Sequence, residues 1–243
     1  MHTVFELPPP PGFQGLDPHK PITGYVRHLP HWRQEGATYF VTFRLHDSLP
    51  HARLKELRQL RRDWEQRHRP PHDKASLEKI AWETMRRVEN WLDRGSGRCW
   101  LKDPMAAKRV ADALRHFDGQ RYELGCFVVM PNHAHVIVRP LDGENDPLER
   151  ILQSWKRHSS NEINQLIGRS GSLWQEESFD RIIRDAEHLY RAIQYIGDNP
   201  AKAFLQGGEY VIWIRPAWND IGWGFALPTS GGVEKPRVLG TIE

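Results

Sequence analysis

Residues 122–138 read YELGCFVVMPNHAHVIV, and this stretch decides the fold. Two apolar runs meet at Pro131, which has no backbone N–H to donate to a strand ladder and so belongs at a turn or bulge. The sequence therefore predicts a strand on each side of this proline, over about 122–130 and 132–138.

The second of these strands carries two histidines at alternate positions. Successive side chains of a strand point to opposite faces, so His133 and His135 lie on the same face. The opposite face of the strand carries Ala134, Val136 and Val138. Two neighbouring imidazoles can act as a pair of metal ligands, but such pairs also occur in ordinary packing or at the surface. The strand alone leaves both interpretations open.

The same patterns predict the other elements of the core. Alternation predicts a strand over 38–45, whose polar face carries Thr38, Thr42 and Arg44. An Asp-Pro start signal followed by an apolar stripe predicts a helix of about fourteen residues from Asp103 and another over 146–168. A short strand over 179–183 and a helix over 185–199 follow.

Two helices, over about 52–66 and 76–92, are predicted inside an insertion at about 50–100. Without it, the order is strand, helix, strand, strand, helix, strand, helix. This is the split βαβ pattern of a ferredoxin-like or RRM-like antiparallel sheet with an added helix, so the predicted fold class is α+β.

The predicted organisation is a single domain with an extension at each end. Prolines from Pro8 to Pro30 predict an extended N-terminal arm over 1–35. The domain spans 36–205, and Gly, Pro and Trp dominate an irregular C-terminal tail over 206–243.

Composition excludes several classes of protein. Hydrophobic residues make up 39% of the chain, which is too apolar for a disordered protein. The longest apolar run, Cys126 to Met130, is far shorter than the ~18 residues of a membrane span. Two cysteines cannot form a disulfide framework. We therefore expect a cytoplasmic protein that does not contact membranes. A net charge of +3 with 13 histidines is compatible with a nucleic-acid partner without requiring one.

The last predicted helix carries a second candidate group. Its buried stripe consists of Leu189, Ala192, Ile193 and Ile196. At about 100° per residue, Tyr195 and Asn199 lie beside that stripe, one turn apart on the same flank. A tyrosine that only fills space belongs on the stripe, so this position favours a chemical role for the hydroxyl. A half-buried structural tyrosine remains the alternative.

Three ordered motifs resemble the single-tyrosine HUH transposases, in particular the REP-associated tyrosine transposases. They are VMPNHAHVIV at 129–138, the pair WQ at 174–175 with DRIIR at 180–184, and YIGDNPAKA at 195–203. The resemblance runs from about Leu29 to Leu205 and implies the HUH endonuclease form of the fold. It also implies His133 and His135 as metal ligands and Tyr195 as the nucleophile. Asn199 stands where many insertion-sequence members have a glutamine, and is implied as the third ligand, with Asp198 as a fallback.

The chemistry of a phenol agrees with that implication. A tyrosine with a pKa of ~10 is a poor nucleophile at neutral pH, so attack on a phosphodiester needs an electrophilic activator. Two imidazoles and an amide oxygen suit Mg²⁺ or Mn²⁺, of which Mn²⁺ tolerates nitrogen better. The predicted reaction cleaves single-stranded DNA, leaving a 5′-phosphotyrosine and a free 3′-OH. Candidate phosphate contacts are Lys156, Arg157, Arg181 and Arg184.

The resemblance also implies a substrate class. It implies hairpins from repetitive extragenic palindromes as the DNA partner, and it leaves monomer and homodimer both open. Two other functions stay open: a hairpin-binding repressor or architectural protein that cuts little, and an RRM-like RNA-binding module. The acidic side chains of Glu176, Glu177 and Asp180 are interpreted as ion-pair partners of Arg181 and Arg184 rather than as metal ligands.

Overall fold

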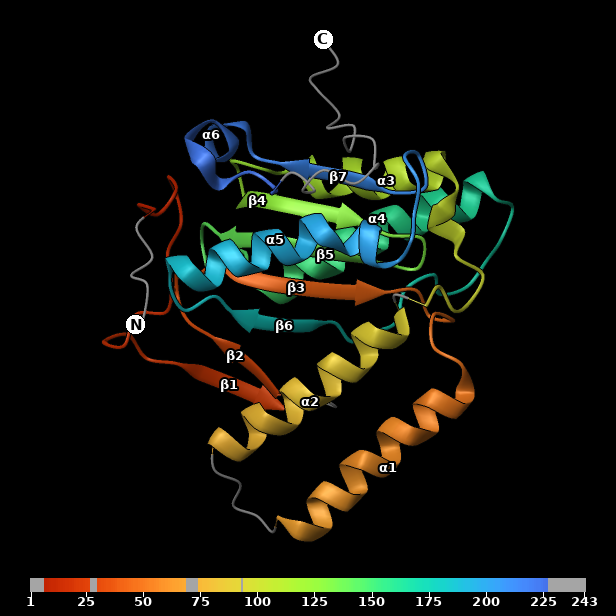
Figure 1. The fold of residues 1–243 in the computed structure, drawn as a ribbon, viewed down its shortest axis with the longest axis horizontal. Coiled ribbons are helices and arrows are strands. Elements are labelled where there is room, and N and C mark those ends of the chain that lie inside the picture. The colour runs from red at the N-terminus through yellow and green to blue at the C-terminus, as the bar shows by residue number, and fades with distance from the viewer. Residues whose placement is uncertain (1–6, 27–29, 69–73, 93, 227–243) are drawn as a thin grey trace.

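In the computed structural model, five strands of the described chain form one antiparallel sheet (Figure 1). The described residues are 7–26, 30–68, 74–92 and 94–226. The strand order is β6-β3-β5-β4-β7. The strands are β3 (Tyr39–Arg44), β4 (Tyr122–Val129), β5 (His133–Pro140), β6 (Phe179–Ile182) and β7 (Val211–Ile214).

Two helices complete the ferredoxin-like core. Helix α3 (Pro104–Arg115) connects β3 to β4, and α4 (Leu148–Leu166) connects β5 to β6. The Asp103 side chain accepts hydrogen bonds from the backbone N–H groups of Met105 and Ala106, which is the predicted N-cap. The order βαββαβ with β3 and β5 at the centre confirms the predicted fold class.

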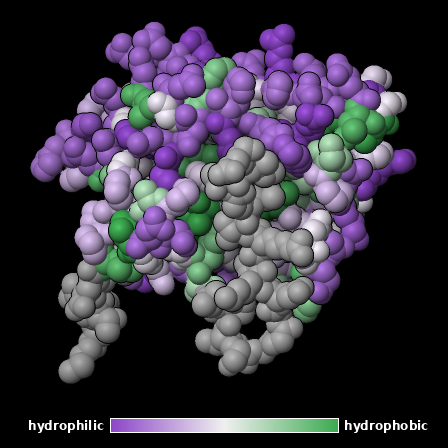
Figure 2. All heavy atoms as spheres, turned by 90° about the horizontal axis from the view of Figure 1, so that it is seen from above, coloured by the Kyte–Doolittle hydropathy of each residue, from purple (hydrophilic) through white to green (hydrophobic). Residues whose placement is uncertain are grey.

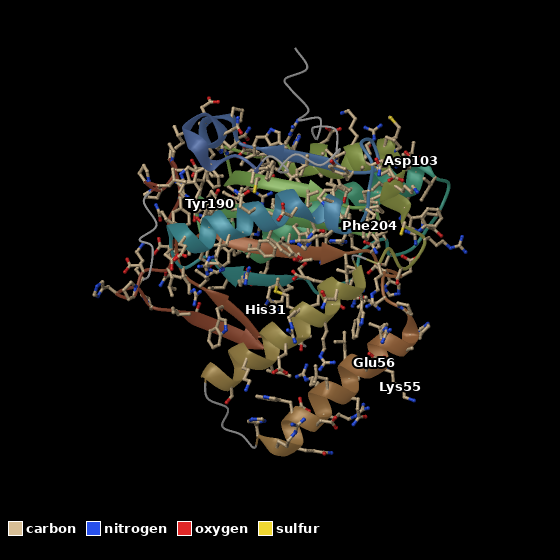
Figure 3. All side chains as sticks on the ribbon, viewed as in Figure 1. His31, Lys55, Glu56, Asp103, Tyr190 and Phe204 are labelled. Carbon is tan, nitrogen blue, oxygen red and sulfur yellow. The ribbon has the colours of Figure 1, made fainter. Side chains whose placement is uncertain are left out.

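The two faces of the sheet are covered by different helices. Side chains of α3 and α4 pack on the face formed by Val41, Ala134 and Val136. Helix α5 (Ala186–Lys202) packs on the opposite face with its buried stripe, as predicted. Tyr190 and Phe204 mark the two ends of this helix, which crosses in front of the sheet (Figure 3). Both faces of the sheet are therefore covered at its centre.

The helical insertion forms two helices as predicted. They are α1 (His51–Arg67) and α2 (Lys74–Leu92), and a 3₁₀ turn (Trp100–Lys102) leads back into the core. Every residue of α1 is at least partly exposed, and α1 lies farther from the sheet than α2 (Figure 1). From α2, Met85 is buried in the apolar cluster that also contains Phe40 and the α5 stripe. The insertion thus contacts the face of the sheet that α5 covers.

The segment before β3 is more structured than an extended arm. Two short strands, β1 (Thr23–Val26) and β2 (Pro30–Arg33), pair antiparallel. His31 and Arg33 of β2 both contact the buried carboxylate of Asp180 on β6. Asp180 therefore pairs with these residues, and the expected ion pairs with Arg181 and Arg184 are wrong for this carboxylate.

The segment after residue 205 also differs from the prediction. It is ordered through Ala226: β7 pairs with β4, and α6 (Pro216–Trp218) and a π-helical turn (Asn219–Trp223) follow. The alternation in the VIWI run buries Ile212 and Ile214, which supplies the apolar face that a fifth strand needs. The predicted irregular tail is therefore wrong for these residues, and residues 227–243 lie outside the described chain.

The end of this segment lies along α5. Gln194 donates from Nε2 to the carbonyl of Gly224 and accepts from the N–H of Ala226. A Cβ atom added at Gly197 would lie 2.7 Å from the ring of Phe225, so this close approach requires glycine. Residues 224–226 therefore hold α5 from its outer side.

Hydrophilic side chains cover most of the molecular face seen in Figure 2. Within the described residues, no helix has the length and apolar composition needed to cross a bilayer.

Candidate metal and nucleophile site

The register of the sheet places both histidines beneath α5. His133 lies opposite Arg44 and His135 opposite Thr42 in the β3–β5 ladder. Residues directly opposite in a ladder share a face, so these four side chains lie on the α5 side. His133 and His135 are 1% and 0% exposed.

Asn132 determines which ring nitrogen of His133 carries a proton. The Nδ2 amide of Asn132 donates to the backbone carbonyls of Leu92 and Ser96, at 3.2 and 3.0 Å. Its Oδ1 is then the atom 2.7 Å from Nδ1 of His133, and an amide oxygen can only accept. Nδ1 of His133 is therefore the protonated nitrogen, and Nε2 carries a lone pair.

His135 has a more adaptable partner. Its Nδ1 lies 2.8 Å from the hydroxyl of Thr42, which can either donate or accept. When this hydroxyl accepts, Nε2 of His135 also presents a lone pair. The tautomer of His135 with its proton on Nδ1, matched by rotation of the Thr42 hydroxyl, prepares the second imidazole as a ligand.

The two Nε2 atoms are 3.1 Å apart and form a hydrogen bond in which, with His133 protonated on Nδ1, Nε2 of His135 donates. A metal ion that takes both nitrogens replaces this bond. Nitrogen ligands at ~2.1 Å from a metal ion, separated by 90° to 110°, lie roughly 3.0 to 3.4 Å from each other. Burial lowers the pKa of His133 to about 3, with Asn199 opposing the shift, and lowers the pKa of His135 well below its usual value. Both rings are thus neutral at pH 7, the state in which imidazole binds a metal ion.

Asn199 supplies the clearest sign of a missing partner. It is 0% exposed, and neither Oδ1 nor Nδ2 makes a hydrogen bond to any residue that the structure describes. Its side chain lies near enough to His133 for a hydrogen-bonding interaction that raises the pKa of that ring, although the geometry falls short of a formed hydrogen bond. A buried amide without partners is costly, by about 1–3 kcal/mol. The amide oxygen beside two imidazoles fits a third ligand for a divalent ion.

Other ligand sets are less well supported. Within the described ranges, no group of three or more His, Cys, Asp or Glu side chains is arranged to hold a metal. Asp198, the fallback ligand, is exposed and lies 3.9 Å from the Lys202 ammonium. An amide oxygen beside the histidine pair is therefore the better fit.

Tyr195 lies against the same histidine pair. Its ring centroid is 5.3 Å from that of His135 in an edge-to-face arrangement, and 5.9 Å from that of Phe40. The hydroxyl oxygen is buried, and the Lys202 ammonium lies 5.0 Å from the ring centroid. The structure thus brings His133, His135, Tyr195 and Asn199 together within one chain.

Two arginines flank this group on the same face of the sheet. Arg44 has no carboxylate of a described residue within ion-pair distance, and burial lowers its pKa to about 10, with Glu177 opposing the shift. Arg181 lies 5.1 Å from the Phe40 ring centroid. Burial lowers the pKa of Arg181 below its usual value, and the charges of Glu89 and Tyr195 only partly oppose this shift. The alternation along 38–45 predicted Arg44 on the polar face of its strand, but no local pattern indicated a role for it in the site.

The other predicted phosphate contacts lie elsewhere. Lys156 donates to the carbonyls of Gln175 and Glu176, and both Lys156 and Arg157 line a cavity of about 750 Å³ that also contains Asp180. Lys156 and Arg157 belong to α4, which covers the face of the sheet opposite to the histidine pair. Arg184 is exposed in the β6–α5 connection. Of the four predicted cations, Arg181 joins the histidine pair.

A larger cavity approaches the site from the insertion. It has a volume of about 1060 Å³ and lies between α1, α2 and the end of the sheet, with Thr42 and Arg44 in its lining. Three arginines and four carboxylates of the described chain line it, namely Arg44, Arg58, Arg61, Asp47, Glu65, Glu89 and Glu177. Its overall charge therefore does not favour phosphate.

Comparisons with known proteins give little beyond this geometry. No protein-family model matches the chain, and no curated protein matches it. Among solved structures, it is similar to a REP-associated tyrosine transposase bound to a REP hairpin, at 16% identity and a TM-score of 0.35. The match covers 74% of this chain and 73% of that one. A likeness at this level supports no conclusion about chemistry, which rests on the residues of this chain.

Proposed function

We propose that this protein is a metal-dependent endonuclease and strand transferase that acts on single-stranded DNA through a 5′-phosphotyrosine at Tyr195. The observation that carries the proposal is the convergence of a tyrosine with two neutral, buried imidazoles and a buried amide that has no hydrogen-bond partner among the described residues. The order of the sequence motifs supports the same reaction class.

The proposed ligands are Nε2 of His133, Nε2 of His135 and Oδ1 of Asn199. Asn132 and Thr42 hold the two rings through their Nδ1 atoms, which directs both Nε2 atoms toward the same point. A bound Mg²⁺ or Mn²⁺ would neutralise charge on the phosphoryl oxygens and make the phosphorus more electrophilic.

The protein's own residues supply the remaining chemistry. The Tyr195 oxygen attacks phosphorus and forms a P–O bond, while the bond between phosphorus and the 3′ oxygen breaks. The proton lost by the phenol is balanced by the one gained by the departing 3′ oxygen. Arg44 and Arg181 bring positive charge to the face where the phosphate is bound. Attack by another 3′-OH reverses the step and transfers the strand.

The site is closed in this structure. Both histidines and the tyrosine hydroxyl oxygen are buried, so a DNA strand reaches them after a covering segment moves. Helix α2 contributes Met85 to the apolar cluster around Phe40 and lines the larger cavity. The resemblance of the motifs, rather than any feature of the fold, implies that the strand belongs to a hairpin-forming palindromic repeat.

The test is a covalent adduct. Wild-type protein incubated with labelled single-stranded DNA and Mn²⁺ should give a protein–DNA band that resists denaturation. Tyr195→Phe should abolish it, because it removes the nucleophilic oxygen and keeps the ring packing. Tyr190→Phe, on the same helix, is the matched control and should form the adduct normally. An undiminished adduct from Tyr195→Phe would overturn the proposal.

The same experiment separates the alternatives. A hairpin-binding repressor would bind the labelled DNA and give no adduct with any metal ion. An RRM-like module needs aromatic side chains on an open sheet face, whereas α5 covers that face here. The RNA-binding alternative is therefore disfavoured by the fold.

A further inference from the structure

We infer that Asn132 is a positioning residue that fixes the tautomer of His133 and connects this histidine to the end of the helical insertion. The inference rests on the proposed function for its significance to catalysis. Its structural content, a single tautomer held by one amide, is independent of that function.

The orientation of the Asn132 amide follows from its partners. Leu92 and Ser96 both offer carbonyl oxygens, which only accept hydrogen bonds, so the NH₂ group must face them. The amide oxygen then faces Nδ1 of His133. The reverse orientation would place oxygen against two oxygens and NH₂ against the ring. With Asn132 only 1% exposed, water cannot easily replace the lost partners.

The turn that carries Asn132 is joined to both ends of the insertion. The carbonyl of Asn132 accepts from the N–H of Leu45, just before the insertion, and the carbonyl of Pro131 accepts from the N–H of Leu101, just after it. Together with the contacts to Leu92 and Ser96, these bonds place the 131–132 turn at the junction of insertion and sheet. The end of α2 thereby reaches His133 through a single side chain.

The oxygen and the NH₂ group of the Asn132 side chain therefore have different roles. The oxygen holds His133 with its proton on Nδ1, so the lone pair on Nε2, which contacts Nε2 of His135 in this structure, is the one available to a cation. The NH₂ group secures the segment that ends the insertion. Substitutions can separate these two contacts: Asn132→Ala removes both, whereas Asn132→Asp keeps an acceptor for Nδ1 and places a second oxygen against the two carbonyls.

The experiment is ¹⁵N NMR of histidine-labelled, metal-free protein, which reports which ring nitrogen is protonated. The His133 signals are assigned by their loss in His133→Gln. Wild type should show His133 with a proton on Nδ1 and none on Nε2. In Asn132→Ala this ring should populate both tautomers, and in Asn132→Asp it should keep the wild-type tautomer. Asn164→Ala, which removes a comparable bond from an amide to the Gly171 carbonyl, should leave His133 unchanged.

Two further measurements complete the test. Mn²⁺ affinity, measured by electron paramagnetic resonance, should fall by about 10- to 100-fold in Asn132→Ala at an unchanged circular dichroism spectrum. Hydrogen exchange at residues 94–98 should accelerate in Asn132→Asp, because that segment loses its anchor. A single unchanged tautomer in Asn132→Ala, or a changed one in Asn132→Asp, overturns the inference.

These outcomes are distinct from a failure of the proposed function. If wild-type protein forms no adduct with DNA while Asn132→Ala still alters the His133 tautomer, the proposed reaction is wrong and the positioning role stands. If the adduct forms and the His133 tautomer does not respond to Asn132→Ala, the positioning role is wrong and the proposed reaction stands.

Discussion

Arg44 lies directly opposite His133 in the pairing of β3 with β5. The two side chains therefore share the face that α5 covers, and Arg44 also lines the cavity next to the insertion. An arginine without a carboxylate in ion-pair range among the described residues, beside a proposed metal ligand, is suited to bind a phosphate oxygen.

The first prediction concerns this arginine. Arg44→Gln should slow formation of the covalent adduct by about 100-fold, the usual effect of removing one group that stabilises transition-state charge, and should leave Mn²⁺ affinity unchanged. Arg44→Lys should recover only part of the rate because an ammonium lacks the planar fork. Single-turnover gels measure the rate. Arg191→Gln, on the exposed side of α5, is the control, and an equal rate in Arg44→Gln contradicts the assignment.

The second prediction concerns Asn199. A carboxylate at this buried position without a metal ion should lower stability by about 2–4 kcal/mol, whereas with Mn²⁺ it becomes a stronger ligand than the amide. The thermal midpoint of Asn199→Asp should therefore fall in EDTA and rise on addition of Mn²⁺ by more than that of wild type. Calorimetric scans with and without metal test this. Asn90→Asp, an exposed change on α2, should behave like wild type.

An equal response of Asn199→Asp and wild type to Mn²⁺ would remove Asn199 from the ligand set. The same calorimetric scans on Asn199→Ala provide a second comparison. This substitution removes the buried amide without partners and should show the smallest response to the metal ion.

The third prediction concerns Thr42, whose hydroxyl contacts Nδ1 of His135. Thr42→Val keeps the shape and removes the only acceptor that this contact offers the ring, so Mn²⁺ affinity should fall by about 10- to 100-fold. Thr42→Ser restores a hydroxyl and should bind the ion nearly as well as wild type. Titration by isothermal calorimetry measures both, and wild-type affinity in Thr42→Val is the contradicting result.

The fourth prediction is a pH dependence of stability. Burial alone lowers the pKa of His31, but hydrogen bonds to Asp180 and Glu177 outweigh it and raise the pKa to about 9. A raised folded pKa gives stability that is complete below pH ~6.5 and is lost as pH rises through 9. Burial raises the pKa of Asp180, but the contacts with His31 and Arg33 outweigh burial and lower this pKa below its usual value. Its contribution is present above pH ~3.8 and is lost in acid.

Urea unfolding across pH should therefore show a maximum at about pH 6.5. Below it stability falls because the unfolded chain protonates His133 and His135, whose folded pKa values burial lowers, and above it stability declines by about 2–3 kcal/mol by pH 9.5. Asp180→Asn should lower the maximum and flatten the alkaline decline, since His31 loses its principal anionic partner. The exposed His19 provides the control, and His19→Gln should reproduce the wild-type profile. A profile of Asp180→Asn parallel to that of wild type is the result against this prediction.

Local patterns in the sequence were sufficient to predict the elements that carry the site. Alternation along 133–138 placed both histidines on one face. The helical phase of 185–199 put Tyr195 and Asn199 beside the buried stripe, which is wrong for Asn199: it is 0% exposed and lies among the buried residues of α5. The Asp103 cap and the two insertion helices were also predictable, because caps and apolar stripes are local signals.

The remaining features depend on contacts between distant residues. Asn132 reaches Leu92 and Ser96 across 40 and 36 positions, and no local pattern reports such a bond. Lys156 was assigned to the DNA mainly from the resemblance and its charge, and the sequence does not tell which face of the sheet its helix covers. The strand β7 was missed because it has only four residues, and pairing with β4 decides their structure.

The segment 224–226, which contacts Gln194 and Gly197 of α5, bears on whether one molecule or two form the proposed site. It contacts the helix that carries Tyr195, and that helix packs on the sheet of the same molecule that carries His133 and His135, so the proposed site is complete without an exchange of helices between copies. Turnover per molecule should then survive thousand-fold dilution, and a mixture of the Tyr195→Phe and His133→Ala proteins should stay inert, since neither can lend its intact half to the other.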